Sequence, residues 1–489
     1  MAKFDVAAAV KTENDLGSHL FLGSRHLNMK VLIVGGGAAG ATAAQFARKQ
    51  DRDAEIIVFE ETPYPEYSRC GLPHALSGEI PSFENLIEFT PEWFQRNKID
   101  LRLSTRVTEV EVHKHELKAD GKNGTTTEHF DSLIIATGAT PSVPRIEGLL
   151  MNERLRDGIF QFRGMDDAKK LKDWCGKGKR KVLVVGAGLV GLEVAEALSK
   201  LNHEVIVAEY LESALPLMID PDMAEPLVSA MANAGVKLII SAAVERVIGA
   251  EEIEGARIKR RSDGSIEQID CDTVVLATGQ KPSTSLAQRM GCKVGRGGHI
   301  LVDMRCETNL KGIFAIGDCS EYKDFVTGAE MPVGLGTLAV RMGEVAGRNA
   351  AGGDSHVPKG FLGARVTRLF GLEIAATGPI TSSISNEVKT IQTRTKGSTL
   401  PPYYPGGKDL LVKLTASADD GRILSCQIVG EKEAGLRIDI VSSFMLGGLT
   451  VGDLAKFENA YAPPVSPCVD ALAVAAQAIL IKLARAKPG

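Results

Sequence analysis

One cysteine, Cys70, stands in a context that suits reactive sulfur chemistry. It belongs to the segment YSRCGLPH, residues 67–74. If a helix begins near Gly71, its N-terminal dipole and the adjacent Arg69 both favour the thiolate over the thiol. The thiolate is the form that attacks disulfides, persulfides and peroxides. Cys70 is therefore the candidate catalytic residue, and His74, one helical turn further on, is a weaker one.

The number and spacing of the other cysteines indicate structural rather than catalytic roles. The chain has eight cysteines at irregular spacing and no CxxC pair, so we expect neither a disulfide framework nor a metal site. The simplest compartment for such a chain is the reducing cytoplasm. Lone cysteines are usually buried as small apolar residues, and we expect this of Cys175, Cys271, Cys292, Cys306, Cys319 and Cys426.

A repeated supersecondary unit must position Cys70. Its first copy has an apolar strand over residues 31–34, the turn GGGAAG over residues 35–40, a helix of small residues, and a strand over residues 55–59 that ends in Glu60. Cys70 follows Glu60 by ten residues. It therefore lies beyond the carboxyl end of a strand, at the edge where open α/β sheets bind ligands.

The same unit returns 151 residues later. An apolar strand over residues 181–185 precedes the turn GAGLVG, residues 186–191, then a helix and a strand over residues 204–208 that ends in Glu209. One GxGxxG is weak evidence, but two copies, each between strand and helix and each followed by an acid, predict two dinucleotide sites. The two residues after Glu209 are not basic. NADH is therefore favoured over NADPH, whose 2′-phosphate needs a cation.

The spacing within each unit has a physical reason. The first glycine permits the tight turn, the second lets the backbone approach a pyrophosphate, and the third lets helix pack on strand. The helix N-terminus offers unpaired N–H groups to the phosphates, and the acid accepts hydrogen bonds from a ribose. Glycine-rich turns without a ligand are the alternative. The candidate binding residues are Gly35, Gly37, Ala38, Ala39, Gly40 and Glu60 in the first unit and Gly186, Gly188, Gly191 and Glu209 in the second.

Three further segments are expected to border bound dinucleotides. Residues 133–138 and 274–279 are apolar strands that end in ATG, and each suits a strand that leaves a sheet beside a cofactor. The strand in residues 312–318 ends in Asp318. A buried carboxylate costs stability unless something pairs with it, and a polyol chain would serve. These segments add Thr137, Gly138, Gly279 and Asp318 to the candidates.

Composition and charge narrow the class of protein. With 489 residues, 44% of them hydrophobic and 24% charged, the chain is typical of a globular protein with more than one domain. Its net charge of −4 gives no electrostatic case for binding nucleic acid. We also expect neither a membrane-spanning helix, which needs roughly 18 apolar residues, nor a secretory signal.

The elements predict three domains and an N-terminal extension. From about residue 355 the pattern changes to a hairpin, residues 411–416 and 423–429, and two helices, residues 434–446 and 469–486. The expected fold is α/β, with two Rossmann-like dinucleotide-binding domains and a C-terminal α+β domain. The extension is either dispensable or a docked arm. The expected boundaries are 1–28 for the extension, 29–148 and 283–354 for the first nucleotide domain, 149–282 for the second, and 355–489 for the third.

Together these features resemble the FAD-dependent pyridine nucleotide–disulfide oxidoreductases over residues 29 to about 485. Members similar to glutathione reductase carry two redox cysteines separated by four residues and a His-Pro-Thr near the C-terminus. This chain has Cys70 without such a partner and lacks the His-Pro-Thr. It therefore resembles the single-cysteine branch, which contains CoA disulfide reductases, NADH-dependent persulfide or polysulfide reductases, NADH oxidases and NADH peroxidases.

The resemblance implies roles for several candidates. FAD is expected over the first unit, with Glu60 at the adenosine ribose, Val107 at the adenine and Asp318 at the ribitol. The helix that begins near Thr337 is expected to point its N-terminus at the pyrimidine edge of the flavin. Glu193 matches an acid near the nicotinamide and flavin N5. Alternatively, Glu193 is an exposed first-turn glutamate that the helix dipole stabilises.

Several positions bear on the reaction within that branch. Peroxidases and many oxidases hold a histidine where this chain has Ala38, which argues against peroxide chemistry. The CGLP run and Tyr461 before Ala-Pro-Pro resemble the CoA disulfide and persulfide reductases, where this tyrosine reaches the active cysteine from the partner subunit. Two residues depart from that group. Arg69 stands where a small or amide residue is usual, and Cys468, in place of a small residue, is either structural or near Cys70 across a dimer.

The resemblance implies an oxidoreductase that passes electrons from NADH through FAD to Cys70. Its expected substrate is a small disulfide, persulfide or polysulfide, CoA-linked ones first, with CoA as a further ligand. A homodimer is implied by the family alone. Three alternatives stay open: an NADH oxidase that reduces oxygen, an electron-transfer flavoprotein that feeds a protein acceptor, and a flavoprotein kept as a binding module.

Overall fold

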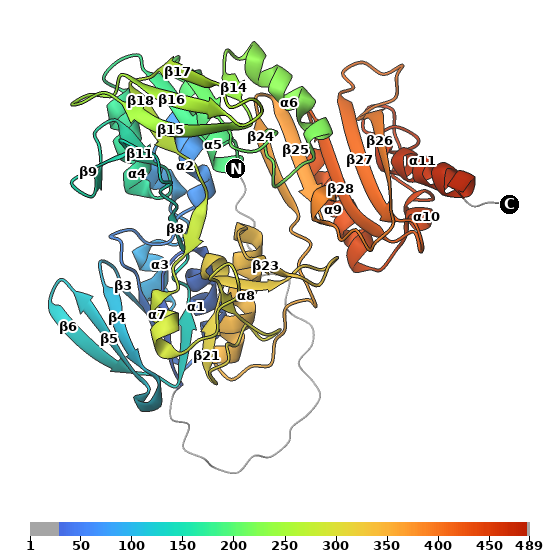
Figure 1. The fold of residues 1–489 in the computed structure, drawn as a ribbon. Helices are drawn as coiled ribbons and strands as arrows, with labels where there is room; N and C mark the ends of the chain where they lie inside the picture. The colour runs from blue at the N-terminus through green and yellow to red at the C-terminus, as the bar shows by residue number, and fades with distance from the viewer. Residues whose placement is uncertain (1–28, 487–489) are drawn as a thin grey trace, which may run out of the picture.

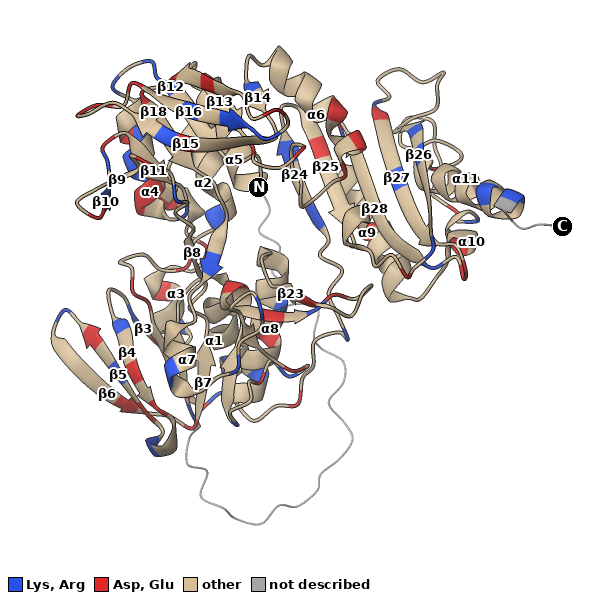
Figure 2. Ribbon diagram, viewed as in Figure 1, with Lys and Arg blue, Asp and Glu red and all other residues tan. Residues whose placement is uncertain are grey.

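The computed structural model describes residues 29–486, which form three parts built around separate sheets (Figure 1). The expectations for residues 1–28 lie outside the described residues. Within the described range, no helix is long and apolar enough to cross a membrane. Acidic and basic residues are interspersed over all three parts (Figure 2).

The first part is a parallel sheet in the order β21-β7-β1-β2-β3. Its strands are continuous apolar runs because both of its faces are covered. Helices α1 and α8 cover one face of the sheet. The two helices lie so close together that a Cβ on Gly343 or Gly347 of α8 would lie 2.6 or 2.2 Å from the backbone of α1. The small residues expected after the first glycine motif are therefore the surface on which α8 packs. The bounds are β1 Lys30–Val34, β2 Glu55–Phe59, β3 Ile99–Arg102, β7 Ser132–Ile135, β21 Ile313–Ala315, α1 Ala38–Gln50 and α8 Gly336–Ala350.

A three-stranded meander and the short helix α7 cover the other face of the sheet. The meander β4-β5-β6 is antiparallel, and its buried Leu117 and Ala119 pack with Leu32 and Phe59 of the sheet. Between β2 and β3 the chain leaves the sheet and carries Cys70. The bounds are β4 Arg106–Glu111, β5 Glu116–Gly121, β6 Gly124–His129, α2 Leu72–Ser77, α3 Pro91–Arg96 and α7 Ser285–Met290.

The second part repeats the architecture of the first. Its sheet is parallel, in the order β11-β18-β12-β13-β14. The strands expected at residues 181–185 and 204–208 have those bounds in the structure. An antiparallel meander, β15-β16-β17, again covers the sheet. The bounds are β11 Ile159–Gln161, β12 Lys181–Val185, β13 Glu204–Ala208, β14 Lys237–Ile239, β15 Ala242–Ile248, β16 Gly255–Arg260, β17 Ile266–Asp270, β18 Thr273–Leu276, α4 Met165–Cys175, α5 Leu189–Lys200 and α6 Pro221–Asn233.

The chain crosses between these two parts twice, and the crossings are tied together. Strands β8, Ala139–Pro141, and β19, Gln280–Pro282, pair antiparallel, and each follows one of the ATG segments. The threonine of each ATG donates to a carbonyl of the other crossing, Thr137 to Ser283 at 2.6 Å and Thr278 to Ser142 at 2.7 Å. The short pairings nearby are β9 Leu150–Met151 with β10 Arg154–Leu155, and β20 Ile300–Leu301 with β22 Ser320–Lys323 and β23 Glu330–Pro332.

The third part is of α+β type, as expected. Its antiparallel sheet has the order β24-β25-β28-β27-β26, and the expected hairpin is its β27-β28 pair. Helices α9 and α11 pack on it through one apolar cluster. The strands β24, β25 and β26 were not expected. The bounds are β24 Arg365–Leu369, β25 Leu372–Thr377, β26 Thr390–Ser398, β27 Asp409–Ser417, β28 Ile423–Gly430, α9 Ala434–Leu446, α10 Val451–Leu454 and α11 Ala471–Ala486.

Candidate functional site

A cavity of about 1180 Å³ opens along the carboxyl edge of the first sheet. It is lined by the first glycine turn, the end of β2, the ATG segment after β7 and the start of β4. An elongated dinucleotide suits such a polar cleft at the switch point of an open sheet. Of the residues expected to bind FAD, the cavity wall includes Gly35, Gly37, Glu60, Val107, Thr137 and Gly138.

The first glycine turn has the shape that a dinucleotide requires. Gly35 has a φ of +107°, and a Cβ there would lie 2.2 Å from the carbonyl oxygen of Ala136. A Cβ on Gly40 would lie 1.9 Å from the carbonyl oxygen of Gly35. Helix α1 begins at Ala38, and no described side chain caps it at Gly37. Its first amides are thus left for an anion.

Glu60 stands at the end of β2 with its carboxylate turned back to this turn. It accepts hydrogen bonds from the amide of Gly36 at 2.8 Å and from the amide of Thr62 at 2.9 Å. This pairing explains how the carboxylate tolerates a site where the residue is only 9% exposed. Lone pairs that remain can accept from a ribose hydroxyl.

The second unit reproduces this geometry. Glu209 accepts from the amide of Ala187 at 2.6 Å and from that of Leu211 at 2.7 Å. Gly186 has a φ of +107°, and a Cβ there would lie 2.4 Å from the carbonyl oxygen of Ala277. A Cβ on Gly191 would lie 2.0 Å from the carbonyl oxygen of Gly186. Of the remaining candidates, Gly188 precedes α5 in open space and Gly279 follows β18 with a φ of +84°.

Cys70 lies in a single 3-10 turn, Arg69–Gly71, directly before α2. The turn is pressed against the loop before α3, because a Cβ on Gly71 would lie 2.3 Å from a methyl group of Leu86. A larger residue after the cysteine would therefore displace the side chain of Leu86. All eight cysteines lie in the described range, and Cys70 and Cys468 are exposed. The other six are buried, as expected from the sequence.

The electrostatics of Cys70 differ from expectation. Burial raises the pKa of its thiol, the carboxylates of Glu193 and Asp318 raise it further, and Arg163 lowers it. The expectation that Arg69 favours the thiolate was wrong, because its guanidinium is turned toward the first glycine turn. One of its nitrogens lies 2.9 Å from the place of a Cβ on Gly37. The cation that acts on the sulfur is Arg163.

Glu193 links three parts of the molecule at this point. It lies on α5 of the second part, its charge acts on Cys70, and its carboxylate accepts from the hydroxyl of Thr367 on β24 at 2.8 Å. Burial raises the pKa of Glu193, and Thr367 and His74 oppose that rise. His74 itself lies 3.1 Å from a carboxylate oxygen of Glu79.

Asp318 and Thr337 are not among the residues that line the cavity, but Asp318 is joined to its wall through Arg163. The carboxylate of Asp318 accepts from Arg163 at 2.7 Å, and Arg163 lines the cavity. Asp318 therefore has a protein partner in addition to the polyol that the sequence suggested. Thr337 is the second residue of α8, and Ala39 and Gly40 lie in the first turn of α1.

Tyr461 lies on the third part, in an exposed loop before α11. Its hydroxyl is 2.8 Å from that of Tyr403, and this hydrogen bond raises the pKa of Tyr461. Cys468, on the same loop, is close enough to act on that pKa as well. Among the contacts that the structure gives, none joins Tyr461 to Cys70 of the same chain.

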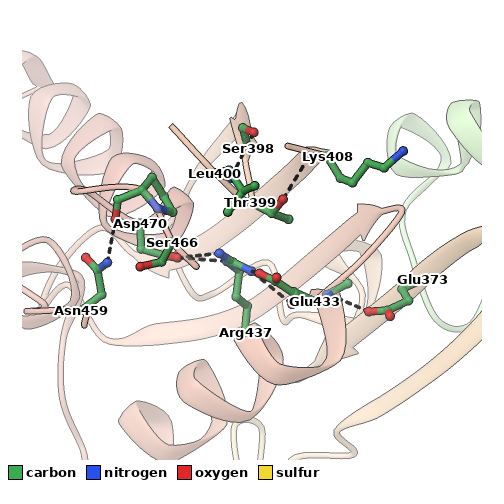
Figure 3. A network of polar contacts seen from close by, with 12 residues as sticks. Glu373, Ser398, Thr399, Leu400, Lys408, Glu433, Arg437, Asn459, Ser466 and Asp470 are labelled. Atoms are coloured by element: carbon green, nitrogen blue, oxygen red, sulfur yellow. Dashed lines mark hydrogen bonds and ion pairs between the residues drawn. The ribbon is translucent and has the colours of Figure 1, made fainter. Parts of the chain in front are cut away.

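The loops that carry the two tyrosines are held by a polar network (Figure 3). Arg437, buried on α9, donates to Asp470 at 3.0 Å, just before α11. Asn459 donates to the carbonyl of Pro467 at 2.9 Å and so spans the loop of Tyr461. Two hydrogen bonds between Thr399 and Lys408, both 2.9 Å, close the loop of Tyr403. Hydrogen bonds therefore hold both of the loops that carry Tyr403 and Tyr461.

Sequence reasoning missed four residues of these sites. Arg163, Thr367 and Tyr403 lie in no motif, and only the fold brings them to Asp318, Glu193 and Tyr461. The fourth, Arg261, follows β16, and its guanidinium carbon lies 4.1 Å from the ring centre of Tyr210, next to Glu209. The residues after Glu209 carry no cation, yet the structure supplies one from 51 residues further on.

Two dinucleotide units, the first of which lines a large cavity, together with an exposed cysteine that follows β2, are typical of a flavoprotein that uses NAD(P)H. Comparison with known proteins agrees: residues 29–342 match the family "Pyridine nucleotide-disulphide oxidoreductase". The chain belongs to this family of oxidoreductases, whose cofactors are FAD and NAD(P)H.

Relatives match along nearly the whole chain. An NADH oxidase of Methanocaldococcus jannaschii is 37% identical over 93% of this chain and 99% of the relative. The NAD(P)H coenzyme A polysulfide/persulfide reductase of Pyrococcus horikoshii is 31% identical, over 93% of this chain and 99% of the relative. The structure of an NAD-dependent persulfide reductase from A. fulgidus is 32% identical, with a TM-score of 0.88, over 93% of this chain and 83% of that one.

Proposed function

We propose that this enzyme uses NADH to reduce a small disulfide, persulfide or polysulfide through FAD and Cys70, with CoA-linked substrates first. One observation carries the proposal. Cys70 is an exposed thiol that Asp318 of the first part and Glu193 of the second both influence, and no other cysteine near it is exposed. A sulfur in that position can hold a substrate sulfur between cofactor sites and solvent.

The chain's own residues have distinct tasks in this scheme. When FAD is bound, it would accept a hydride from NADH and pass the electron pair on to sulfur. Gly35, Gly37 and Glu60 would hold the FAD, and Asp318, fixed by Arg163, would bind its ribitol. The thiolate of Cys70 attacks a sulfur of the substrate, so that a bond from Cys70 to that sulfur forms while the sulfur–sulfur bond of the substrate breaks, and the released thiolate takes a proton. The bond on Cys70 is the one that the electron pair from the cofactor would reduce, which restores the Cys70 thiolate.

Charged and titratable groups near Cys70 set how readily its thiol ionises for that attack. Because burial, Glu193 and Asp318 raise the pKa of the thiol, Arg163 is the group that favours its reactive form. Burial also raises the pKa of Glu193. A raised pKa suits a carboxyl that passes a proton to a leaving thiolate.

We further propose that the enzyme is a homodimer in which Tyr461 reaches the partner's Cys70. The third part exposes several large apolar side chains, which a second copy of the chain would cover. The exposed side chains include Leu436 at 70%, Leu446 at 54%, Val465 at 66%, Val469 at 50% and Ile481 at 53%.

We also propose which segments bind each cofactor, and in which compartment the enzyme works. We assign FAD to residues 29–148 and 283–354, NADH to residues 149–282 and dimerisation to residues 355–489. The crossings at β8 and β19 support the first two divisions. We place the enzyme in the cytoplasm, because its eight cysteines form no disulfide.

Anaerobic NADH oxidation with CoA disulfide as acceptor tests the reaction. Wild type, Cys70→Ser and the matched control Cys468→Ser are compared. Turnover should vanish in Cys70→Ser, while NADH still bleaches the flavin in that variant, and Cys468→Ser should stay active. NADH that bleaches the flavin of wild type without any transfer to disulfide, persulfide or polysulfide would sink the proposal.

An NADH oxidase is the second candidate, and the M. jannaschii relative favours it. Ala38 stands against it, because peroxidases and many oxidases have a histidine at that position. Oxygen consumption separates the two. If oxygen supports turnover faster than every sulfur acceptor, and Cys70→Ser abolishes it, oxygen is the substrate. Turnover only with an added protein acceptor would instead indicate an electron-transfer flavoprotein.

A further inference from the structure

Arg69 lacks an anionic partner among residues 29–486, although it lines the FAD cavity. Its guanidinium stacks beside the ring of Tyr67, 5.3 Å from the ring centre, and its charge acts on Glu66 without forming an ion pair. Arg69 is exposed, so its donors are free to bind the phosphate of a ligand in the cavity. The three other arginines of the wall are bound within the protein: Arg163 to Asp318 at 2.7 Å, Arg106 to Glu61 at 3.7 Å and Arg289 to the carbonyl of Thr108 at 3.1 Å.

The position of this guanidinium defines where that charge would sit. One of its nitrogens lies 2.9 Å from the place of a Cβ on Gly37, the residue before α1. No described side chain caps α1, so the amides of its first turn and the guanidinium converge on one point. Both are electropositive and both favour an anion there.

Nearby carboxyl groups do not supply this anion. Glu60 points its oxygens at the amides of Gly36 and Thr62. Glu66 lies in the same recess, only 6% exposed, and one of its oxygens has no partner among the described residues. Burial and Glu88 raise the pKa of Glu66 to about 7, so this carboxyl is largely neutral below that pH.

We propose that Arg69 binds the pyrophosphate of FAD at the N-terminus of α1, as a cofactor-binding residue directly beside the redox cysteine. A planar guanidinium can donate two hydrogen bonds to one phosphate, which the small or amide residue of similar enzymes cannot do. The position of Glu60 places the adenosine ribose next to Gly36, so the pyrophosphate falls at Gly37, within reach of Arg69.

FAD release from the full-length holoenzyme tests this assignment. Free FAD fluoresces more strongly than bound FAD, so dilution series give its dissociation constant for wild type, Arg69→Gln and Arg69→Lys. We expect about tenfold or weaker binding in Arg69→Gln and a smaller loss in Arg69→Lys, which keeps the charge but not the fork. The loss should shrink as ionic strength rises.

Competitors show which group of FAD the arginine contacts. ADP carries the pyrophosphate and adenosine does not, and both are scored by the FAD that they displace. Arg69→Gln should weaken ADP as a competitor and leave adenosine unchanged. The matched control is Arg106→Gln, which removes the same charge from the same cavity wall and should leave the ADP to adenosine ratio as in wild type.

Two results would overturn the assignment. The first is Arg69→Gln protein that holds FAD as tightly as wild type but has a higher KM for CoA disulfide, which would give Arg69 to the pyrophosphate of CoA. The second is an equal loss of ADP and adenosine, which would mean that Arg69 acts through the fold. Unchanged FAD binding or an equal loss of ADP and adenosine overturns the assignment whether or not the reaction proposed above is correct, because the readout is FAD itself. Only the reassignment of Arg69 to CoA rests on that reaction.

Discussion

At the scale of single residues, the site works by setting the charge of a few titratable groups. Cys70 is an exposed residue whose sulfur is partly shielded from water, and this shielding and two carboxylates favour its thiol form, against one arginine. A thiol that ionises too easily is a weaker nucleophile, and one that ionises too late is mostly unreactive, so its rate depends on this balance. The negative charge of Glu193 can be removed by substitution without altering the wall of the FAD cavity, which does not include Glu193.

Glu193→Gln should make Cys70 react faster with iodoacetamide. Loss of the negative charge lowers the pKa of the thiol, so the midpoint of the rate against pH moves to lower pH. We expect about a two- to fivefold faster rate at neutral pH. The measurement uses a Cys468→Ser background, because the six remaining cysteines are buried.

The matched control is Glu196→Gln. Glu196 lies one turn further along α5 and pairs with Lys200 at 3.1 Å, and it does not act on Cys70. Its removal should leave the alkylation profile in place. Equal profiles for Glu193→Gln and wild type would contradict the assigned electrostatics.

Glu66→Gln should stabilise the protein at pH 8 but not at pH 5. Burial and Glu88 raise the pKa of Glu66 to about 7 from an ordinary 4.5, while Arg69 and the amide of Phe89 oppose them. The folded state thus favours the neutral acid, and this contribution is lost as pH rises through about 7. The neutral amide avoids the buried charge, a gain of at most about 3 kcal/mol.

Thermal melting at the two pH values checks this, with Glu251→Gln as an exposed control. A rise of a few degrees in Tm at pH 8, absent at pH 5, is the expected result. The same rise at both pH values would mean that Gln improves packing rather than removing a charge.

At the scale of elements, strand and helix positions followed from local patterns, whereas contacts between elements did not. Both βαβ units and the helix at residues 434–446 were predicted, because apolar periodicity and glycine turns are encoded locally. The meanders alternate weakly and expose many polar residues, so they carry no comparable signal. Arg69 was assigned to the cysteine because the two are adjacent in sequence, but its side chain extends to the glycine turn.

The contact between Arg261, after β16, and Tyr210, after β13, is of this kind, and it bears on the choice of cofactor. Arg261 donates to the carbonyl of Tyr210 at 2.9 Å, beside Glu209. A guanidinium there can receive a 2′-phosphate, while Glu209 favours a free ribose hydroxyl. The enzyme should therefore prefer NADH and still accept NADPH.

Arg261→Gln should lower kcat/KM for NADPH about tenfold and change that for NADH less than twofold. Steady-state kinetics with both nucleotides gives the ratio. Arg257→Gln, on the same strand but paired with Glu245 at 3.3 Å, is the control and should leave the ratio unchanged. A similar fall for both nucleotides in Arg261→Gln would show a structural role only.

At the scale of the whole molecule, the candidate site residues lie on three parts, and the described chain does not bring Tyr461 to Cys70. The two nucleotide parts meet at Cys70 and Glu193. The tyrosine pair lies on the third part, without a contact to Cys70 in the chain described. The network of Figure 3 holds the two loops, through Thr399 and Lys408 on one and through Asn459 and Asp470 on the other. Two exposed hydroxyl groups on such loops suit a task in a second subunit.

A mixed dimer decides whether Tyr461 serves its own chain or its partner. Cys70→Ser and Tyr461→Phe proteins are each expected to be nearly inactive as homodimers. In a dimer of one chain of each kind, one site contains intact Cys70 with intact Tyr461 from the partner, and the other site lacks both. Random exchange of subunits gives about half mixed dimers, so turnover should recover to about a quarter of wild type.

If Tyr461 serves its own chain, every site of the mixed dimer carries one substitution and no turnover returns. The control mixes Cys70→Ser with Cys70→Ser/Tyr461→Phe, which offers no intact thiol in any arrangement and should stay inactive. Full activity of the Tyr461→Phe homodimer would remove the tyrosine from the reaction altogether. Recovery in the mixture alone would require that the active site is built from two chains, with the apolar face of the third part as the contact that assembles it.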